Sequence, residues 1–220
     1  MNISDVARAR FNMIEQQIRP WNVLDAHVLS LLADVQREAF VPAAYQALAF
    51  ADMEIALGHG QFMLAPRLEA RMLQDLQIQP EDKVLEIGTG SGFMAALLAR
   101  QGRSVLSLER IPALAAIATQ NLRQAGVFNV DVRVADGAQP VAGNERFDAI
   151  VLSGSVSKVP KHLLDLLAVG GRLITIAGEE PIMQAHLVTR ISDTALRRTT
   201  PWDANAPRLH GFAEESHFHF

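Results

Sequence analysis

The sequence contains no cysteine among its 220 residues. This absence excludes a disulfide framework, an iron–sulfur centre bound by thiolates, zinc bound by cysteine, and catalysis by a cysteine nucleophile. Long apolar runs are also missing: the stretch Phe93–Ala99 is too short to span a bilayer, and the first twenty residues lack the apolar segment of a secretory signal. The formal net charge of -4 argues against binding of nucleic acid through bulk positive charge. We therefore expect a cytoplasmic protein that binds neither membranes nor nucleic acid.

The composition is that of a folded chain, since 49% of the residues are apolar and 20% are charged. Its length suits one compact unit, in which we distinguish three zones. Residues 1–50 are expected to form a helical cover, with an apolar stripe that ends at Pro20 and a second helix that begins after Asp25. Residues 51–82 carry an irregular lid loop, broken by glycines at 58 and 60, and a lead-in helix.

Residues 83–220 are expected to form a Rossmann-like domain. Strands and helices alternate here, a pattern typical of an α/β fold with a doubly wound, mostly parallel sheet of seven strands. Three of the expected strands, at 130–135, 147–153 and 171–177, read as continuous apolar runs buried on both faces, and a helix is expected over 161–168. The seven expected strands cover residues 83–87, 104–109, 130–135, 147–153, 171–177, 185–191 and 195–202.

A glycine-rich loop, Gly88-Thr89-Gly90-Ser91-Gly92, follows the first of these strands and opens a helix. Ligands of open α/β sheets bind at this position, where glycines allow a close approach of the backbone. Its spacing differs from the dinucleotide pattern G-x-G-x-x-G, because position 93 is phenylalanine, and it lacks the lysine of a phosphate-binding loop. Glu86, just before the loop, would repel a pyrophosphate but suits the amino group of an amino-acid-like ligand.

Two further acidic residues end the next predicted strands. Glu109 is placed to accept both hydroxyls of a ribose, and Asp136 with Gly137 is placed to contact an adenine edge. Three carboxylates in one crevice favour a nucleoside with a cationic amino-acid arm, which is the shape and charge of S-adenosylmethionine.

The chain resembles the protein-L-isoaspartate O-methyltransferase family of class I S-adenosylmethionine-dependent methyltransferases. The resemblance covers about residues 35–178 and includes the upstream LGHGQ, the loop VLEIGTGSGF and the downstream SLERI. It implies a methyltransferase that converts S-adenosylmethionine to S-adenosylhomocysteine and acts on a carboxylate of a protein or peptide. Further matching segments are REAFVP at 37–42, ADG at 135–137, FDAIVLS at 147–153, VP at 159–160 and GGRLITIAG at 170–178.

The resemblance also implies roles for single residues. The loop around His59 and Gly60 would form part of a lid, and Ser153 would lie near the transferring methyl group; these two side chains, Ser153 and His59, are the catalytic candidates. No metal is expected: His217 and His219 have a metal-like spacing but no third ligand nearby. The residues expected to bind the cofactor are Gln61, Glu86, Gly88, Thr89, Gly90, Ser91, Gly92, Glu109, Arg110, Asp136 and Gly137.

The substrate loop departs from the family pattern, in which glutamine is followed by Thr-Ile-Ser. Here Gln61 is followed by Phe62, Met63 and Leu64, so both hydroxyls are missing. A wall without hydroxyl donors offers less to a carboxylate, which predicts weak or absent isoaspartyl activity. Two alternatives stay open: a methyltransferase for a different, apolar small-molecule acceptor, and a non-catalytic module that binds S-adenosylmethionine.

Overall fold

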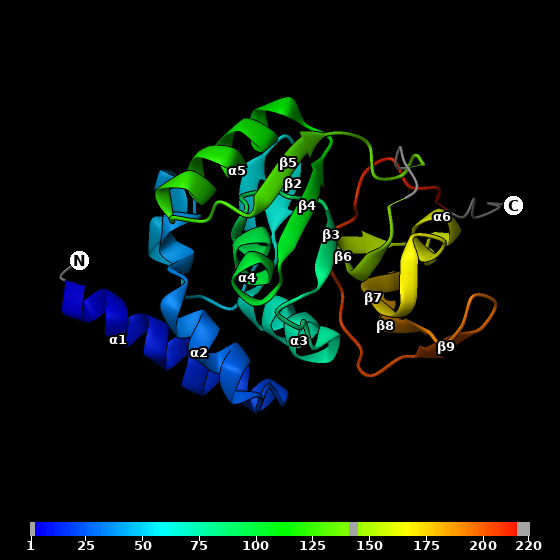
Figure 1. Ribbon diagram of the computed structural model, residues 1–220. Helices are drawn as coiled ribbons and strands as arrows, with labels where there is room; N and C mark the ends of the chain where they lie inside the picture. The colour runs from blue at the N-terminus through cyan, green and yellow to red at the C-terminus, as the bar shows by residue number, and fades with distance from the viewer. Residues whose placement is uncertain (1–2, 141–144, 215–220) are drawn as a thin grey trace, which may run out of the picture.

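The alternating segments after residue 83 build a seven-stranded sheet in the computed structural model, which describes residues 3–140 and 145–214 (Figure 1). The strand order is β5-β4-β3-β6-β7-β8-β9; the pairs from β5 to β7 are parallel, and β8 and β9 are antiparallel additions. The predicted mostly parallel, seven-stranded sheet is confirmed. His217 and His219 lie outside the described residues. The strands are β3 (Lys83–Ile87), β4 (Ser104–Glu109), β5 (Val130–Val134), β6 (Phe147–Val156), β7 (Leu167–Glu179), β8 (Ile182–Arg190) and β9 (Leu196–Thr199).

The helices follow the apolar stripes of the sequence. Asp25 caps α2 as expected, since its side chain accepts hydrogen bonds from the backbone N–H groups of His27 and Val28. The regular helix ends at Ile18, and the 3₁₀ turn that contains Pro20 ends at Trp21, so the expected stop at Pro20 is correct to within two residues. The helices are α1 (Ile3–Met13), prolonged by a π turn (Ile14–Ile18) and a 3₁₀ turn (Arg19–Trp21), α2 (Ala26–Asp34), two 3₁₀ segments (Arg37–Ala39 and Ala43–Leu48), α3 (Pro66–Leu76), α4 (Phe93–Gln101), α5 (Pro112–Gln124) and α6 (Lys161–Leu164).

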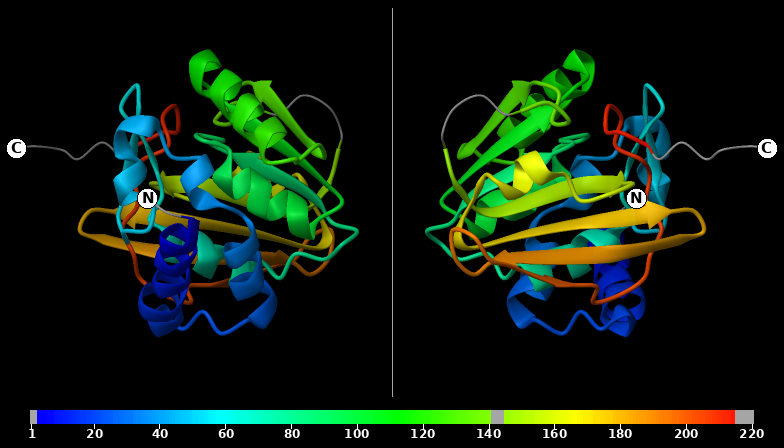
Figure 2. Two further views of the ribbon diagram at one scale, coloured as in Figure 1. Left: turned by 90° about the vertical axis from the view of Figure 1, so that its left-hand side faces the viewer. Right: turned by 90° about the vertical axis from the view of Figure 1, so that its right-hand side faces the viewer.

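The two faces of the sheet are covered unequally. On one face, Val84, Val105 and Val151 pack with apolar side chains of the N-terminal helices and of α3, α4 and α5. On the other face, Leu85 and Ile150 belong to a smaller cluster that includes side chains of α6 and of the C-terminal segment. Figure 2 shows the long β7–β8 ribbon (yellow to orange) crossing the molecule between α5 (green) and the N-terminal helices (blue). On this second face, Leu209 and Phe212 of the C-terminal segment, whose described residues form no helix or strand after β9, pack on the same cluster as the short helix α6.

The irregular structure expected for the lid loop is wrong, because residues 55–63 form a hairpin; its role as a lid stays a prediction. Strand β1 (Ile55–Gly58) pairs with β2 (Gln61–Met63) in a separate antiparallel sheet. Its turn holds His59 at φ 55° between two glycines that also have positive φ. The glycines therefore allow the turn rather than break the strands.

Two expectations inside the large sheet also need correction. Strand β5 is not buried on both faces: it is the edge strand, and Val134 is 58% exposed. The helix expected over 161–168 ends at Leu164, and β7 already begins at Leu167. Both errors arise because an apolar run does not reveal whether it lies in the middle of a sheet or at its margin.

The segment after β9 returns to the sheet and runs beside β3 and β6 (Figure 1). It is fixed at the end of β6, where the N–H of Ser155 donates to the carbonyl of Pro207 at 2.7 Å and the N–H of Leu209 donates to the carbonyl of Ser155 at 2.9 Å. None of the helices in the described part of the chain has the length and apolar sequence needed to cross a membrane.

Candidate functional site

The glycine-rich loop turns sharply between β3 and α4. Gly88, Gly90 and Gly92 all have positive φ, and Gly92 is the residue that caps α4. A side chain at position 88 would also collide with Leu209, whose Cδ2 lies 2.7 Å from the place of a Cβ atom. Both the backbone conformation and the close packing therefore require glycine here.

Glu109, at the end of β4, is fixed against this loop. One of its carboxylate oxygens accepts a hydrogen bond from the N–H of Gly90 at 2.9 Å, and the other accepts one from the N–H of Ile111 at 2.9 Å. The side chain is buried, with the residue 6% exposed, yet it borders a cavity. The carboxylate is thus held in one orientation before any ligand arrives.

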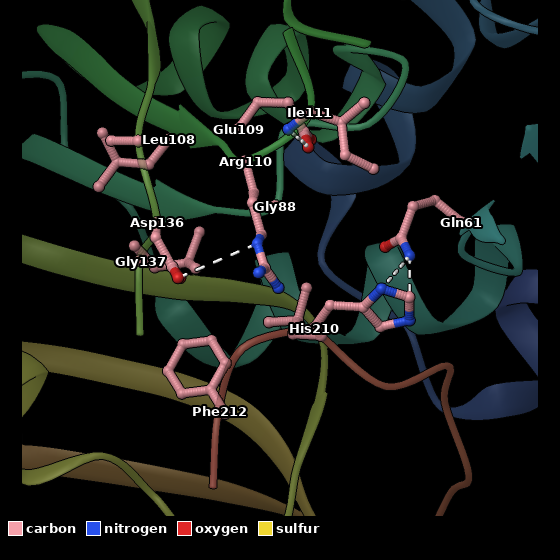
Figure 3. Close-up of a pocket in the computed structure, with 13 residues that line it drawn as sticks. Gln61, Gly88, Leu108, Glu109, Arg110, Ile111, Asp136, Gly137, His210 and Phe212 are labelled. Carbon is pink, nitrogen blue, oxygen red and sulfur yellow. Dashed lines mark hydrogen bonds and ion pairs between the residues drawn. The ribbon is translucent and has the colours of Figure 1, made fainter. Parts of the chain in front are cut away.

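This first cavity has a volume of about 300 Å³ and lies at the carboxyl ends of β3, β4 and β5 (Figure 3). Six of its lining residues are among the predicted cofactor-binding residues: Gln61, Gly88, Glu109, Arg110, Asp136 and Gly137. Asp136 lies 3.9 Å from Arg110 and accepts a hydrogen bond from the N–H of Ala138. Gly137 has no room for a side chain, since a Cβ atom would lie 2.4 Å from Ile87.

Glu86 lies deeper, at the end of β3, and is completely buried. Its carboxylate oxygens accept hydrogen bonds from the hydroxyls of Ser107 at 2.5 Å and Ser153 at 2.8 Å, and Ser107 is also bonded to Thr89 at 2.6 Å. Burial raises the pKa of Glu86 to about 8, although the two serine hydroxyls oppose this shift. A cation entering beside Glu86 would favour its charged form.

A second, small cavity of about 20 Å³ lies between Glu86 and the substrate loop. Its walls include Phe62, Met63 and Leu64 of the loop, and its polar residues are Glu69, Glu86, Thr89, Ser91 and Ser153. Met63 and Leu64 are buried, whereas Phe62 is 44% exposed. The space around Glu86 is therefore small, with polar groups near the glycine loop and an apolar wall on the side of the substrate loop.

The two catalytic candidates are not brought together. Ser153 is bonded to Glu86 and borders the second cavity. His59 is exposed at the hairpin turn and lines neither cavity. Gly60 follows His59, and a Cβ atom built at position 60 would lie 4.0 Å from the Cε1 atom of His210.

The C-terminal segment contributes lining residues that sequence reasoning missed. Leu209, His210 and Phe212 border the first cavity, and the side-chain nitrogen of Gln61 lies 3.0 Å from the Nδ1 atom of His210 (Figure 3). Phe212 stacks on His162 with ring centroids 6.4 Å apart. These residues carry no periodic pattern, and only Gly211 marks a turn, so no sequence signal pointed to them.

Within the described residues, there is no group of three or more histidine, cysteine, aspartate or glutamate side chains that could hold a metal ion.

Comparisons with known proteins agree on one family. The family model described as "Protein-L-isoaspartate(D-aspartate) O-methyltransferase (PCMT)" matches residues 8–201. The chain is 39% identical to a protein-L-isoaspartate O-methyltransferase of Methanoculleus marisnigri over 81% of each chain, and 38% identical to one of Koribacter versatilis over 90% of this chain and 89% of that one. It is also similar in fold, with a TM-score of 0.76 and 21% identity, to a Plasmodium falciparum crystal structure described as a protein-L-isoaspartate O-methyltransferase in complex with S-adenosyl-L-homocysteine; the match covers 91% of this chain and 97% of that one.

Proposed function

Since the chain belongs to the protein-L-isoaspartate(D-aspartate) O-methyltransferase family, we propose that it transfers the methyl group of S-adenosylmethionine to a carboxylate of a protein or peptide. The observation that carries this proposal is the placement of Glu109 and Glu86 beside two cavities that share Gly88 of the glycine loop, at the carboxyl ends of neighbouring parallel strands.

The proposal assigns the residues around these two cavities to successive parts of the cofactor. Glu109, with its two fixed oxygens, would bind the ribose hydroxyls, and Asp136 with Gly137 would border the adenine. Gly88 to Gly92 would surround the methionine arm, whose ammonium group would favour ionised Glu86. The first cavity, at about 300 Å³, suits the adenosine part. Arg110 and Gln61 would close its rim.

Bound S-adenosylmethionine supplies an electrophilic methyl group on a positively charged sulfur. The chain's own residues orient the acceptor in line with that methyl group and exclude water from the narrow space near Glu86. A carboxylate acceptor is already ionised at neutral pH, because its ordinary pKa is about 4, so the reaction needs no general base. The separation of Ser153 from His59 is compatible with this chemistry.

The substrate loop favours a restricted choice of acceptor. Phe62, Met63 and Leu64 provide no hydroxyl to replace the water that an isoaspartyl carboxylate loses on binding, so we expect weak or absent isoaspartyl activity. The same apolar wall favours a second candidate function, methyl transfer to an apolar small molecule.

The experiment is a methyl-transfer screen with radiolabelled S-adenosylmethionine. An isoaspartyl peptide, the matched aspartyl peptide and a set of small aromatic acids and phenols are compared as acceptors. Base-labile methyl ester on either peptide supports the main proposal, and a rate that is low on the isoaspartyl peptide supports the assigned effect of the loop. Label found only in small molecules would favour the second candidate, and no transfer to any acceptor would overturn both.

A further inference from the structure

A second carboxylate, that of Glu69, lies at the methionine end of the pocket. Glu69 belongs to α3, is 3% exposed, and lines the same small cavity as Glu86 and the glycine loop. The predicted cofactor-binding residues do not include it, and a carboxylate taken out of water needs a compensating positive charge or hydrogen bond.

Arg37 provides part of that compensation. This fully buried arginine forms an ion pair with the Oε2 atom of Glu69. Its guanidinium also donates to the carbonyls of Ala49 at 3.1 Å and Leu64 at 2.7 Å, and it lies 5.0 Å from the ring centroid of Phe93. Arg37 is shared among four neighbours and does not line the cavity. It holds Glu69 in place, and Glu69 is the member of the ion pair that lines the cavity.

The charges of the pocket favour a cationic ligand between the two glutamates. Burial raises the pKa of Glu69 to about 7 against the attraction of Arg37, and Glu69 itself contributes to the raised pKa of Glu86. Two carboxyl groups facing one narrow space repel each other when both are ionised. An ammonium group placed between them removes that repulsion and gains two attractive interactions.

We propose that Glu69 acts with Glu86 to bind the α-ammonium group of the cofactor's methionine arm, which makes Glu69 a cofactor-binding residue supplied by α3. The inference rests on the proposed use of S-adenosylmethionine and adds a residue to that site. It also gives the Arg37–Glu69 pair a role: the pair links the bound methionine arm to Leu64 of the substrate loop.

The test is the affinity of Glu69→Gln for two ligands that differ only at the methionine end. S-adenosylhomocysteine carries the α-ammonium group, whereas 5′-methylthioadenosine keeps the adenosine and sulfur but lacks the amino-acid arm. Isothermal titration calorimetry is expected to show that Glu69→Gln binds S-adenosylhomocysteine about tenfold more weakly and 5′-methylthioadenosine as the unaltered protein does. A structural role alone would weaken both ligands equally.

Asp82→Asn is the matched control, because Asp82 is also a buried carboxylate paired with an arginine, Arg172 at 2.6 Å, but precedes β3 at the other end of the strand. It is expected to change neither affinity. Should Glu69→Gln not fold, Glu69→Asp keeps the charge and shortens its reach, and a severalfold loss confined to S-adenosylhomocysteine is expected. Unchanged or equal losses for the two ligands would overturn the inference. These measurements use no methyl acceptor, so a negative acceptor screen leaves them intact.

Discussion

The two ends of the proposed cofactor pocket, its adenosine end and its methionine end, are built differently. At the adenosine end, Glu109 is fixed by two backbone N–H groups and borders a cavity of about 300 Å³. At the methionine end, Glu86 is bonded to serine hydroxyls, and the space beside it is only about 20 Å³. The first end is fixed before any ligand arrives, as a nucleoside site requires. At the second end, the carboxyl groups of Glu86 and Glu69 border one small cavity next to the substrate loop, and a cationic ligand there would favour their charged forms.

Removing the carboxylate of the adenosine end should have the largest effect. Glu109→Ala is expected to weaken binding of S-adenosylhomocysteine and of 5′-methylthioadenosine alike, by about 100-fold, because both ligands carry the ribose and hydrogen bonds to a charged group contribute about 1.5–3 kcal/mol. Calorimetry measures both affinities.

Glu109→Gln is the graded control, since it keeps one oxygen as an acceptor, and its loss should be intermediate. Unchanged affinity in Glu109→Ala would mean that the adenosine lies elsewhere.

Removing the charge of Glu86, at the methionine end, should change the free energy of unfolding of the ligand-free protein. The folded-state pKa of Glu86, about 8, lies above its ordinary value of 4.5, so its contribution to stability is complete below pH 4.5 and is lost as the pH rises to 8. Glu86→Gln cannot ionise, and we expect the ligand-free variant to be more stable than the unaltered protein by about 2 kcal/mol at pH 8 and by much less at pH 5. Urea unfolding at both pH values measures this, and a difference that does not vary with pH would contradict it.

The acceptor side can be changed by restoring the missing hydroxyls. Phe62→Thr combined with Leu64→Ser should raise the rate of isoaspartyl-peptide methylation about tenfold, because each hydroxyl can donate to the acceptor carboxylate. The control, Phe62→Val with Leu64→Ala, opens a similar space without hydroxyls. An equal gain in the control would show that space, rather than hydrogen bonding, limits the reaction.

The smallest effect is expected at the rim of the adenosine end. His210→Ala removes the contact with Gln61, and because this contact is open to solvent, dissociation of S-adenosylhomocysteine should accelerate only about threefold. Stopped-flow displacement measures the rate. His59→Ala, at the nearby hairpin turn, should leave it unchanged; the same acceleration in both variants would argue against a specific role for His210.

The contrast between the two ends also explains what could be predicted from the sequence. The glycine loop and Glu109 follow apolar strands at fixed places, so local patterns sufficed to predict the sheet and to place these residues beside the first cavity. Leu209 and Glu69 could not be found this way, because each reaches the pocket through a long-range contact that no local pattern encodes. The hairpin turn at His59 was misread because glycines mark a turn without indicating whether strands flank it.

The C-terminal segment has a consequence for biosynthesis. Leu209 and Phe212 complete the wall of the adenosine cavity, yet they are translated roughly a hundred residues after the glycine loop, which at ribosomal speeds corresponds to about 5–20 seconds. During that interval the nascent chain holds the loop and its carboxylates without the wall that retains a nucleoside. In the proposed binding mode, tight retention of the cofactor therefore begins only after Leu209 and Phe212 have been added to the chain.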